Sequence, residues 1–151
     1  MATSMVHVTA HASTRMHLAV VAAVGFIVLA VLQVALALGA PLGEAAYGGT
    51  HTDLPVALRI TSAFAAIVYG FATLLVLRCA GYRVPLIGER VARVGTWVLA
   101  GLLPLAALMN FASSSEWERF GWGPIALVLG ILCYLIARAS RPEPQVMVAR
   151  G

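Results

Sequence analysis

The side chains best suited to chemistry in this sequence are polar groups that lie within or beside long apolar segments. Gln33 lies inside one such segment, Arg59 begins another, and Asn110 lies near the end of a third. Glu116 and Glu118 follow Asn110 closely. Polar groups inside a membrane are costly, so they usually face neighbouring helices and have partners. These five residues therefore predict a polar binding pocket, in which Arg59 holds an anion or a carboxylate.

The same residues also have a purely structural interpretation, which is the commoner one. Arg59 can snorkel to lipid headgroups, or it can pair with Glu116 or Glu118. Gln33 and Asn110 can form interhelical hydrogen bonds, which stabilise membrane helices by about 0.6 kcal/mol on average. The sequence leaves both interpretations open.

Metal and redox chemistry have little support in the sequence. His51 and Asp53, with Glu44 nearby, are a weak metal signal because a structural zinc site usually has more His or Cys ligands. Cys79 and Cys133 form no CxxC pair and are expected to be buried apolar residues. No Asp, Glu or Lys lies deep in an apolar segment, and phosphate-loop, serine-hydrolase and zinc-protease motifs are absent from the sequence. We therefore expect no catalytic residue, no metal and no cofactor.

The composition indicates which elements position the polar residues. Of the 151 residues, 61% are hydrophobic and 11% are charged, whereas soluble domains have roughly 45–50% and about 25%. Four charge-free runs are each long enough to cross a hydrocarbon core of roughly 30 Å as a helix. Backbone groups in lipid must bond to one another, so each run predicts a helix. The runs are residues 18–43, 60–77, 94–115 and 120–137.

The predicted fold class is therefore all-α, a four-helix transmembrane bundle. The membrane domain is expected to cover residues 17–139, between a tail of residues 1–16 and a tail of residues 140–151. The spans are expected at about residues 17–39, 57–78, 93–112 and 121–138.

The arginines predict the orientation of the bundle. All ten basic residues are arginine, and only Arg59 and Arg119 fall at the face that holds the first and third connections. The other eight fall at the opposite face, and positive residues concentrate on the cytoplasmic side. Both termini are therefore predicted in the cytoplasm (N-in/C-in), and the five polar residues at the outer face. Basic groups beside apolar segments indicate an anionic leaflet and not a nucleic acid partner.

Turn residues and aromatic residues mark the predicted outer face. The glycines and proline of residues 39–43 and the pair Gly48-Gly49 predict turns, and Asp53 with Pro55 resembles a helix start before the second span. An outer aromatic belt is expected at Trp117, Phe120 and Trp122.

Small residues predict which helix faces pack together, because they allow close approach of backbones in lipid. Such faces suit the interior of one bundle or a homo-oligomer interface, and packing within one bundle is the simpler choice. In the fourth span the face consists of Gly123, Ala126, Gly130, Cys133 and Ala137; in the second, Ser62, Ala66 and Gly70; in the first, Ala19, Ala23, Phe26, Ala30, Gln33 and Ala37.

Two groups of residues carry a resemblance to known sequences. The first is Leu38-Gly39-Ala40-Pro41-x-Gly43, Gly48-Gly49 and Leu54-Pro55-x-x-Leu58-Arg59; the second is Asn110-x-x-Ser113-x-Ser115, Glu118-Arg119, Trp122 and Pro124. The arrangement, over residues 17–138, resembles an uncharacterised family of small four-helix integral membrane proteins from bacteria with GC-rich genomes. The resemblance implies a fold and a membrane location but no activity.

The expected function is that of a non-enzymatic accessory or structural component of a bacterial cytoplasmic membrane. Its expected partners are the lipid bilayer and either another membrane protein or a second copy of the chain. The alternative is an oligomeric small transporter or channel subunit with an outward-facing polar site, which requires a cavity that continues through the membrane. A lipid-acting enzyme that uses Glu116 or Glu118 is the weaker alternative and requires a lateral opening with a carboxylate in it.

Overall fold

The fold, obtained as a computed structural model, consists of four long helices and no strand within the described part of the chain, residues 2–140. Side chains are described from residue 13 onward. The predicted all-α class with four helices is confirmed, since all four are long and apolar enough to cross a membrane. The helices are α1 (Ala2–Ala37), α2 (Val56–Ala80), α3 (Glu89–Ala112) and α4 (Gly123–Ala139).

The apolar parts of these helices agree with the predicted spans to within a few residues at each end, at Ser13–Ala37, Val56–Ala80, Glu89–Ala112 and Trp117–Ala139. The larger difference lies at the N-terminus, where a tail was expected over residues 1–16 but α1 begins at Ala2. The first glycine is Gly25 and the first proline is Pro41, so nothing interrupts the helix. Extending a nucleated helix is far easier than starting one. The predicted C-terminal tail lies outside the described residues, apart from Ser140.

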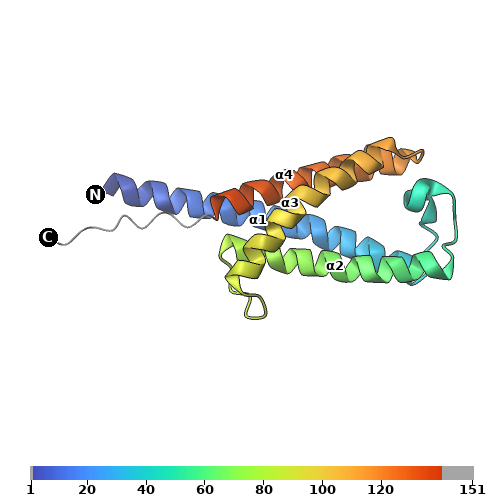
Figure 1. The fold of residues 1–151 in the computed structure, drawn as a ribbon, viewed down its shortest axis with the longest axis horizontal. Coiled ribbons are helices and arrows are strands. Elements are labelled where there is room, and N and C mark those ends of the chain that lie inside the picture. The colour runs from blue at the N-terminus through green and yellow to red at the C-terminus, as the bar shows by residue number, and fades with distance from the viewer. Residues whose placement is uncertain (1, 141–151) are drawn as a thin grey trace.

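The helices form two antiparallel pairs, α1 with α2 and α3 with α4, and contacts within each pair are more extensive than contacts between the pairs. Figure 1 shows the pairs diverging toward one end, where the α1–α2 loop lies between them. We call this the long-loop end. The other end, which holds the start of the apolar part of α1, the α2–α3 connection and the end of α4, is the arginine-rich end.

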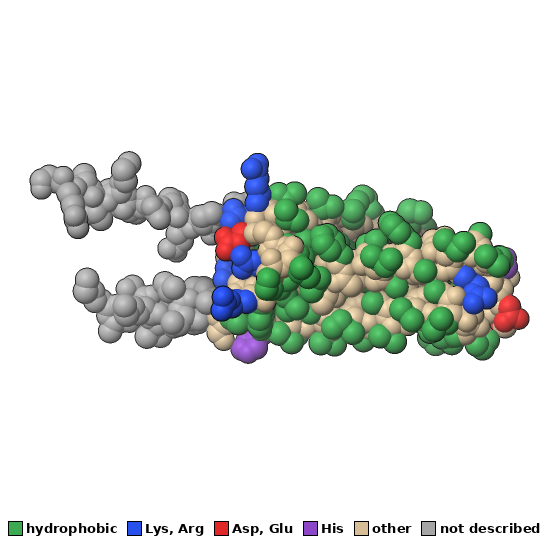
Figure 2. Space-filling view, turned by 90° about the horizontal axis from the view of Figure 1, so that it is seen from below, with side chains coloured by type: hydrophobic (Ala, Val, Ile, Leu, Met, Phe, Trp, Pro, Cys, Tyr) green, Lys and Arg blue, Asp and Glu red, His purple; other side chains and the backbone are tan. Residues whose placement is uncertain are grey.

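The surface of the bundle is apolar over most of its length. Figure 2 shows hydrophobic side chains along the visible face and charged side chains gathered at the two ends. Large exposed side chains occur on every helix, among them Val31, Phe64, Leu105 and Ile131. So much exposed apolar surface is unfavourable in water, and it matches lipid as the surrounding solvent.

Small residues allow neighbouring helices to pack closely, as predicted for the fourth span. Gly123, Ala126, Gly130, Cys133 and Ala137 are all buried on one face of α4. A β-carbon added at Gly130 would lie 2.9 Å from Cδ of Pro104, so α3 and α4 approach closely there. In α1 the predicted face is buried at Ala19, Ala23 and Phe26, and only partly buried at Ala30, Gln33 and Ala37. In α2 the face is buried at Ser62, but Ala66 and Gly70 are only partly buried.

The long-loop end is built from short turns. The 3-10 turns η1 (Gly43–Ala45) and η2 (Tyr47–Gly49) fold the α1–α2 loop, and the π-helical turn η3 (Trp117–Trp122) leads into α4. Gly39, Gly48 and Gly49 have positive φ angles, which confirms the turn predictions there. Pro55 directly precedes α2, as expected for a helix start.

Candidate functional site

A cavity of about 210 Å³ lies between the two helix pairs at the long-loop end. All four helices contribute to its wall, and η2 and η3 contribute at its outer rim. For comparison, a cavity of roughly 150 Å³ can hold benzene. The cavity is lined by Leu29, Leu32, Gln33, Ala46, Tyr47, Tyr69, Leu103, Ala106, Asn110, Glu118, Trp122, Ile125 and Ala126.

Hydrogen bonds fasten the α1–α2 loop over the end of the α3–α4 pair. The backbone N–H of Gly48 donates to Oε1 of Glu118 at 2.9 Å, and the hydroxyl of Ser113 donates to the other carboxylate oxygen. The indole Nε1 of Trp122 donates to the carbonyl oxygen of Ala45. The bonds from Gly48 and from Trp122 join segments 70 and 77 residues apart in sequence, so they hold the loop as the cover of the cavity.

Tyr47 joins the same loop to α2. It has a positive φ of 52°, which is uncommon for a residue other than glycine. Its hydroxyl donates to the carbonyl of Leu58 at 3.3 Å and shares a hydrogen bond of 2.8 Å with the hydroxyl of buried Ser62. The strained backbone is therefore tied to a specific side-chain position at the cavity wall.

Gln33 contributes the cavity's unsatisfied polar atom. Its side-chain oxygen Oε1 is buried and has no hydrogen-bond partner among the described residues. Asn110 also lines the cavity, but its amide nitrogen donates to Ala106 of its own helix at 2.9 Å. Within the described residues, neither side chain forms the interhelical hydrogen bond that the structural interpretation assigned to it. An unpaired buried oxygen is costly, so it points to a donor that a bound molecule or a water supplies.

The chemistry of the cavity is that of an acceptor-rich, aromatic site. Gln33 and Asn110 offer amide oxygens, and the carboxylate of Glu118 has no cationic partner in the described chain, where the one ion pair joins Arg78 to Glu89. The rings of Tyr47, Tyr69 and Trp122 are also in the wall. Carboxylates and aromatic faces both attract cations, and amide oxygens accept hydrogen bonds from N–H groups.

Arg59 and Glu116, two of the five predicted site residues, lie away from this cavity. Nε of Arg59 donates to the carbonyl of Ala37 at 2.9 Å, so the guanidinium binds the C-terminal end of α1. Arg59 also lines a separate surface depression with Ala37, Val56, Ile60 and Ala63. Glu116 is exposed to solvent. The structure thus brings together Gln33, Asn110 and Glu118, and it separates Arg59 and Glu116 from them.

The polar residues of the α1–α2 loop do not converge. Thr52 donates to Glu44 at 3.4 Å, His51 bonds to the hydroxyl of Thr50, and Asp53 is exposed. Within the described part of the chain, no group of three or more His, Cys, Asp and Glu side chains could hold a metal ion. Cys79 and Cys133 are buried free thiols, as the sequence predicted.

Sequence reasoning missed Tyr47, Tyr69 and Trp122 as cavity residues. Trp122 was assigned to an aromatic belt together with Trp117 and Phe120, which are indeed largely exposed. Trp122 differs because its indole bonds to the loop and its ring lines the cavity. A signal was available for Tyr69, because a tyrosine deep in an apolar span needs a polar partner for its hydroxyl.

The middle of the bundle is packed. Along α4 the cavity residues Ile125 and Ala126 are followed by the buried core residues Leu129, Cys133 and Ile136. Along α1, Gln33 and Leu29 in the cavity wall are preceded by buried Phe26 and the buried alanines at 19, 22 and 23. The cavity is therefore confined to the half of the bundle at the long-loop end.

Comparisons with known proteins give no further guide: no protein-family model matches the chain, and no curated protein or solved structure is similar to it.

Proposed function

We propose that the protein is a non-enzymatic membrane component that binds a small organic cation, such as a primary amine, in the cavity at its long-loop end. The observation that carries this proposal is the buried, unpaired Oε1 of Gln33 in a cavity that also contains the carboxylate of Glu118. An ammonium group donates the hydrogen bond that Gln33 lacks. The aromatic wall suits both the positive charge and a short hydrocarbon chain.

The position of Glu118 favours binding over catalysis. Both of its oxygens already accept hydrogen bonds, one from Gly48 of the α1–α2 loop and one from Ser113 at the end of α3. This use of the carboxylate gives the lipid-acting enzyme less support, and Glu116 is exposed to solvent, outside the cavity lining. The packed core beyond the cavity gives a conduction path through a single bundle less support as well. An accessory role, in which ligand binding modulates contacts with another membrane protein or a second copy, accords best with these features.

The location we propose is the cytoplasmic membrane of a bacterium, with the long-loop end outside. Six of the eight arginines in the described part of the chain lie at the opposite end, which supports a cytoplasmic position for both termini. A C-terminal fluorescent-protein fusion tests this orientation, because the reporter is expected to fluoresce in the cytoplasm. A C-terminus that is accessible to impermeant reagents in intact cells would reverse it.

The binding proposal is tested by calorimetric titration of the purified protein with three probes of one shape: isobutylammonium, isobutanol and isobutyrate. Because the probes are small, we expect a Kd of about 1 mM for the ammonium, or about −4 kcal/mol. Isobutanol is expected to bind more weakly, and isobutyrate not at all. Equal heats for all three probes, or none for the ammonium, would refute the proposal.

Two variants test whether isobutylammonium binds in the cavity. Gln33→Met keeps the size of the side chain but removes the acceptor, and it is expected to weaken isobutylammonium binding. Val34→Met changes the neighbouring, exposed residue on the same helix and is expected to leave binding unchanged. Similar affinities in the two variants would place the ammonium outside the cavity.

A further inference from the structure

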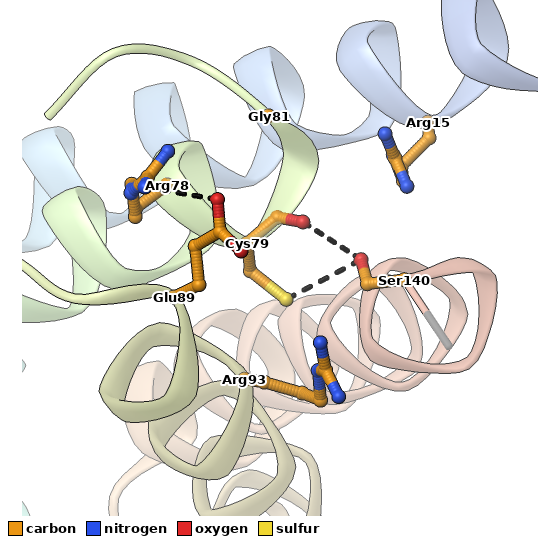
Figure 3. Close-up of a pocket in the computed structure, with 7 residues that line it drawn as sticks. All are labelled: Arg15, Arg78, Cys79, Gly81, Glu89, Arg93 and Ser140. Carbon is orange, nitrogen blue, oxygen red and sulfur yellow. Dashed lines mark hydrogen bonds and ion pairs between the residues drawn. The ribbon is translucent and has the colours of Figure 1, made fainter. Parts of the chain in front are cut away.

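A second pocket, of about 170 Å³, lies at the arginine-rich end, where Arg15 of α1 meets the end of α2, the start of α3 and the end of α4. It is distinct from the cavity at the long-loop end, and the packed core separates the two. Figure 3 shows its lining: Arg15, Arg78, Cys79, Gly81, Glu89, Arg93 and Ser140.

The charges around this pocket do not cancel. Three guanidinium groups and one carboxylate line it, so it carries two more positive charges than negative ones. Arg78 pairs with Glu89 at 3.1 Å and also donates to the carbonyl of Ile87. This pair uses the pocket's carboxylate, which leaves Arg15 and Arg93 without an acidic partner among residues 13–140.

Arg15 is held in place by the ends of two helices. Its Nε donates to the carbonyl of Ala80 at 3.1 Å, and its Nη1 donates to the carbonyl of Ala139 at 3.3 Å. The C-terminal ends of α2 and α4 carry partial negative charge, which favours a cation at this position. Nη2 remains, and it faces Gly81, where an added β-carbon would lie 3.5 Å from it. The missing side chain at Gly81 keeps space open beside this donor.

All the hydrogen-bond donors of the Arg93 guanidinium remain for a ligand. It has no hydrogen-bond or ion-pair partner within the described residues, and it is only partly exposed. In Figure 3 the guanidinium groups of Arg15 and Arg93 lie on either side of Ser140. The hydroxyl of Ser140 is already engaged, since its one hydrogen lies within reach of the carbonyls of Cys79 and Ile136 and its oxygen accepts from the Cys79 thiol. The donors of the pocket that remain without a partner in the described chain are therefore on the cationic groups of Arg15 and Arg93.

We propose that this pocket binds a phosphate group, held between Arg93 and the free edge of Arg15. Guanidinium groups match phosphate oxygens in charge and geometry, and a phosphate is smaller than the pocket. Basic pockets between membrane helices are a known form of site for anionic lipid headgroups. A phospholipid headgroup and a free phosphate present the same chemistry, and the experiment separates them.

The test uses the full chain in a nonionic detergent, titrated with short-chain dihexanoyl phosphatidylglycerol, dihexanoyl phosphatidylcholine and inorganic phosphate. We expect phosphatidylglycerol to bind and phosphatidylcholine, whose choline offsets the phosphate charge, to bind much more weakly. If inorganic phosphate competes at similar concentrations, the source is a free phosphate; if it does not, the source is a lipid headgroup. Failure of both anions to bind would overturn the proposal.

Three substitutions test whether the anion binds in this pocket. Arg93→Gln is expected to lower the affinity for the bound anion about tenfold, and Arg93→Lys is expected to recover part of it. Arg90→Gln removes the same charge from an exposed position on the same helix, outside the pocket, and is expected to change affinity less than twofold. Equal losses for Arg90→Gln and Arg93→Gln would show diffuse surface attraction and overturn the proposal.

Discussion

Replacing Gln33 by methionine is expected to stabilise the protein without ligand while impairing its ligand binding. Gln33 places a buried oxygen in the cavity wall with no partner in the described chain. Methionine has nearly the same length and no group that requires a hydrogen bond. The substitution therefore removes a desolvation cost while it preserves the packing around the side chain.

The size of the effect follows from the cost of an unsatisfied buried acceptor, about 1–3 kcal/mol. The cavity of about 210 Å³ is large enough and polar enough to admit water, which offsets part of that cost. We therefore expect a gain of about 1 kcal/mol, close to the lower end of the range. Residues that serve binding often lower the stability of the folded protein, so replacing them often stabilises it.

The assay is equilibrium unfolding of the purified protein from a mild detergent into sodium dodecyl sulfate, followed by circular dichroism. Leu32→Met is the matched control, because it places methionine beside Gln33 in the same cavity wall without removing a polar atom. It is expected to be neutral or to cost less than about 1.5 kcal/mol. A loss of stability in Gln33→Met beyond that control would mean that the glutamine forms a stabilising hydrogen bond, and the reasoning would fail.

Three further predictions concern packing and caps. Gly130→Ala would place a β-carbon 2.9 Å from Pro104 and is expected to lower the free energy of unfolding by about 1–3 kcal/mol in the same assay. The matched variant Gly101→Ala would meet no atom within 4 Å, so it is expected to leave the free energy of unfolding unchanged or to raise it by up to about 1 kcal/mol. Gly43→Ala would bring a β-carbon within 2.1 Å of a backbone oxygen, so the loop is expected to lose its fold and to become protease-sensitive in the purified protein. Arg59→Gln removes the hydrogen bond that caps the C-terminal end of α1 and is expected to lower the free energy of unfolding by about 1 kcal/mol. The affinity for isobutylammonium in calorimetry is expected to stay unchanged. A large loss of affinity would show that Arg59 takes part in binding.

The helices could be predicted because the membrane allows few alternatives. A charge-free run in lipid must satisfy its own backbone, so its length and its flanking charges locate the helix. The helical start of α1 could not be predicted in the same way. Its first residues mix Thr, Ser and His with Ala and Val and show no clear period, but they contain neither glycine nor proline, so the helix continues through them.

The candidate site could be predicted only in part, because a span shows the depth of a residue but not the direction in which its side chain points. Gln33, Asn110 and Glu118 were grouped by their depth, and the structure places them in one cavity. Arg59 has a similar depth, yet it binds the carbonyl of Ala37 on the end of α1. That contact depends on where α1 ends and on how α2 is rotated, neither of which the residue pattern determines.

The cover of the cavity was beyond prediction for a different reason. Tyr47 and Trp122 lie on separate loops, and their roles arise only when the α1–α2 loop folds onto η3. Glycines predicted that the loop turns but not what it contacts. Long-range docking of this kind depends on side-chain hydrogen bonds between distant segments, for which a single sequence carries little signal.

The pairing of the helices has a consequence for how the protein is made. Each half of the chain is a helical hairpin whose partners are adjacent in sequence, so α1–α2 can insert and associate before α3–α4 leaves the ribosome. Until the second hairpin docks, Gln33 has no cavity to line and lies on a surface open to lipid. The cavity therefore requires both hairpins, and a chain that is arrested between them is expected to present the unpaired amide of Gln33 to the bilayer.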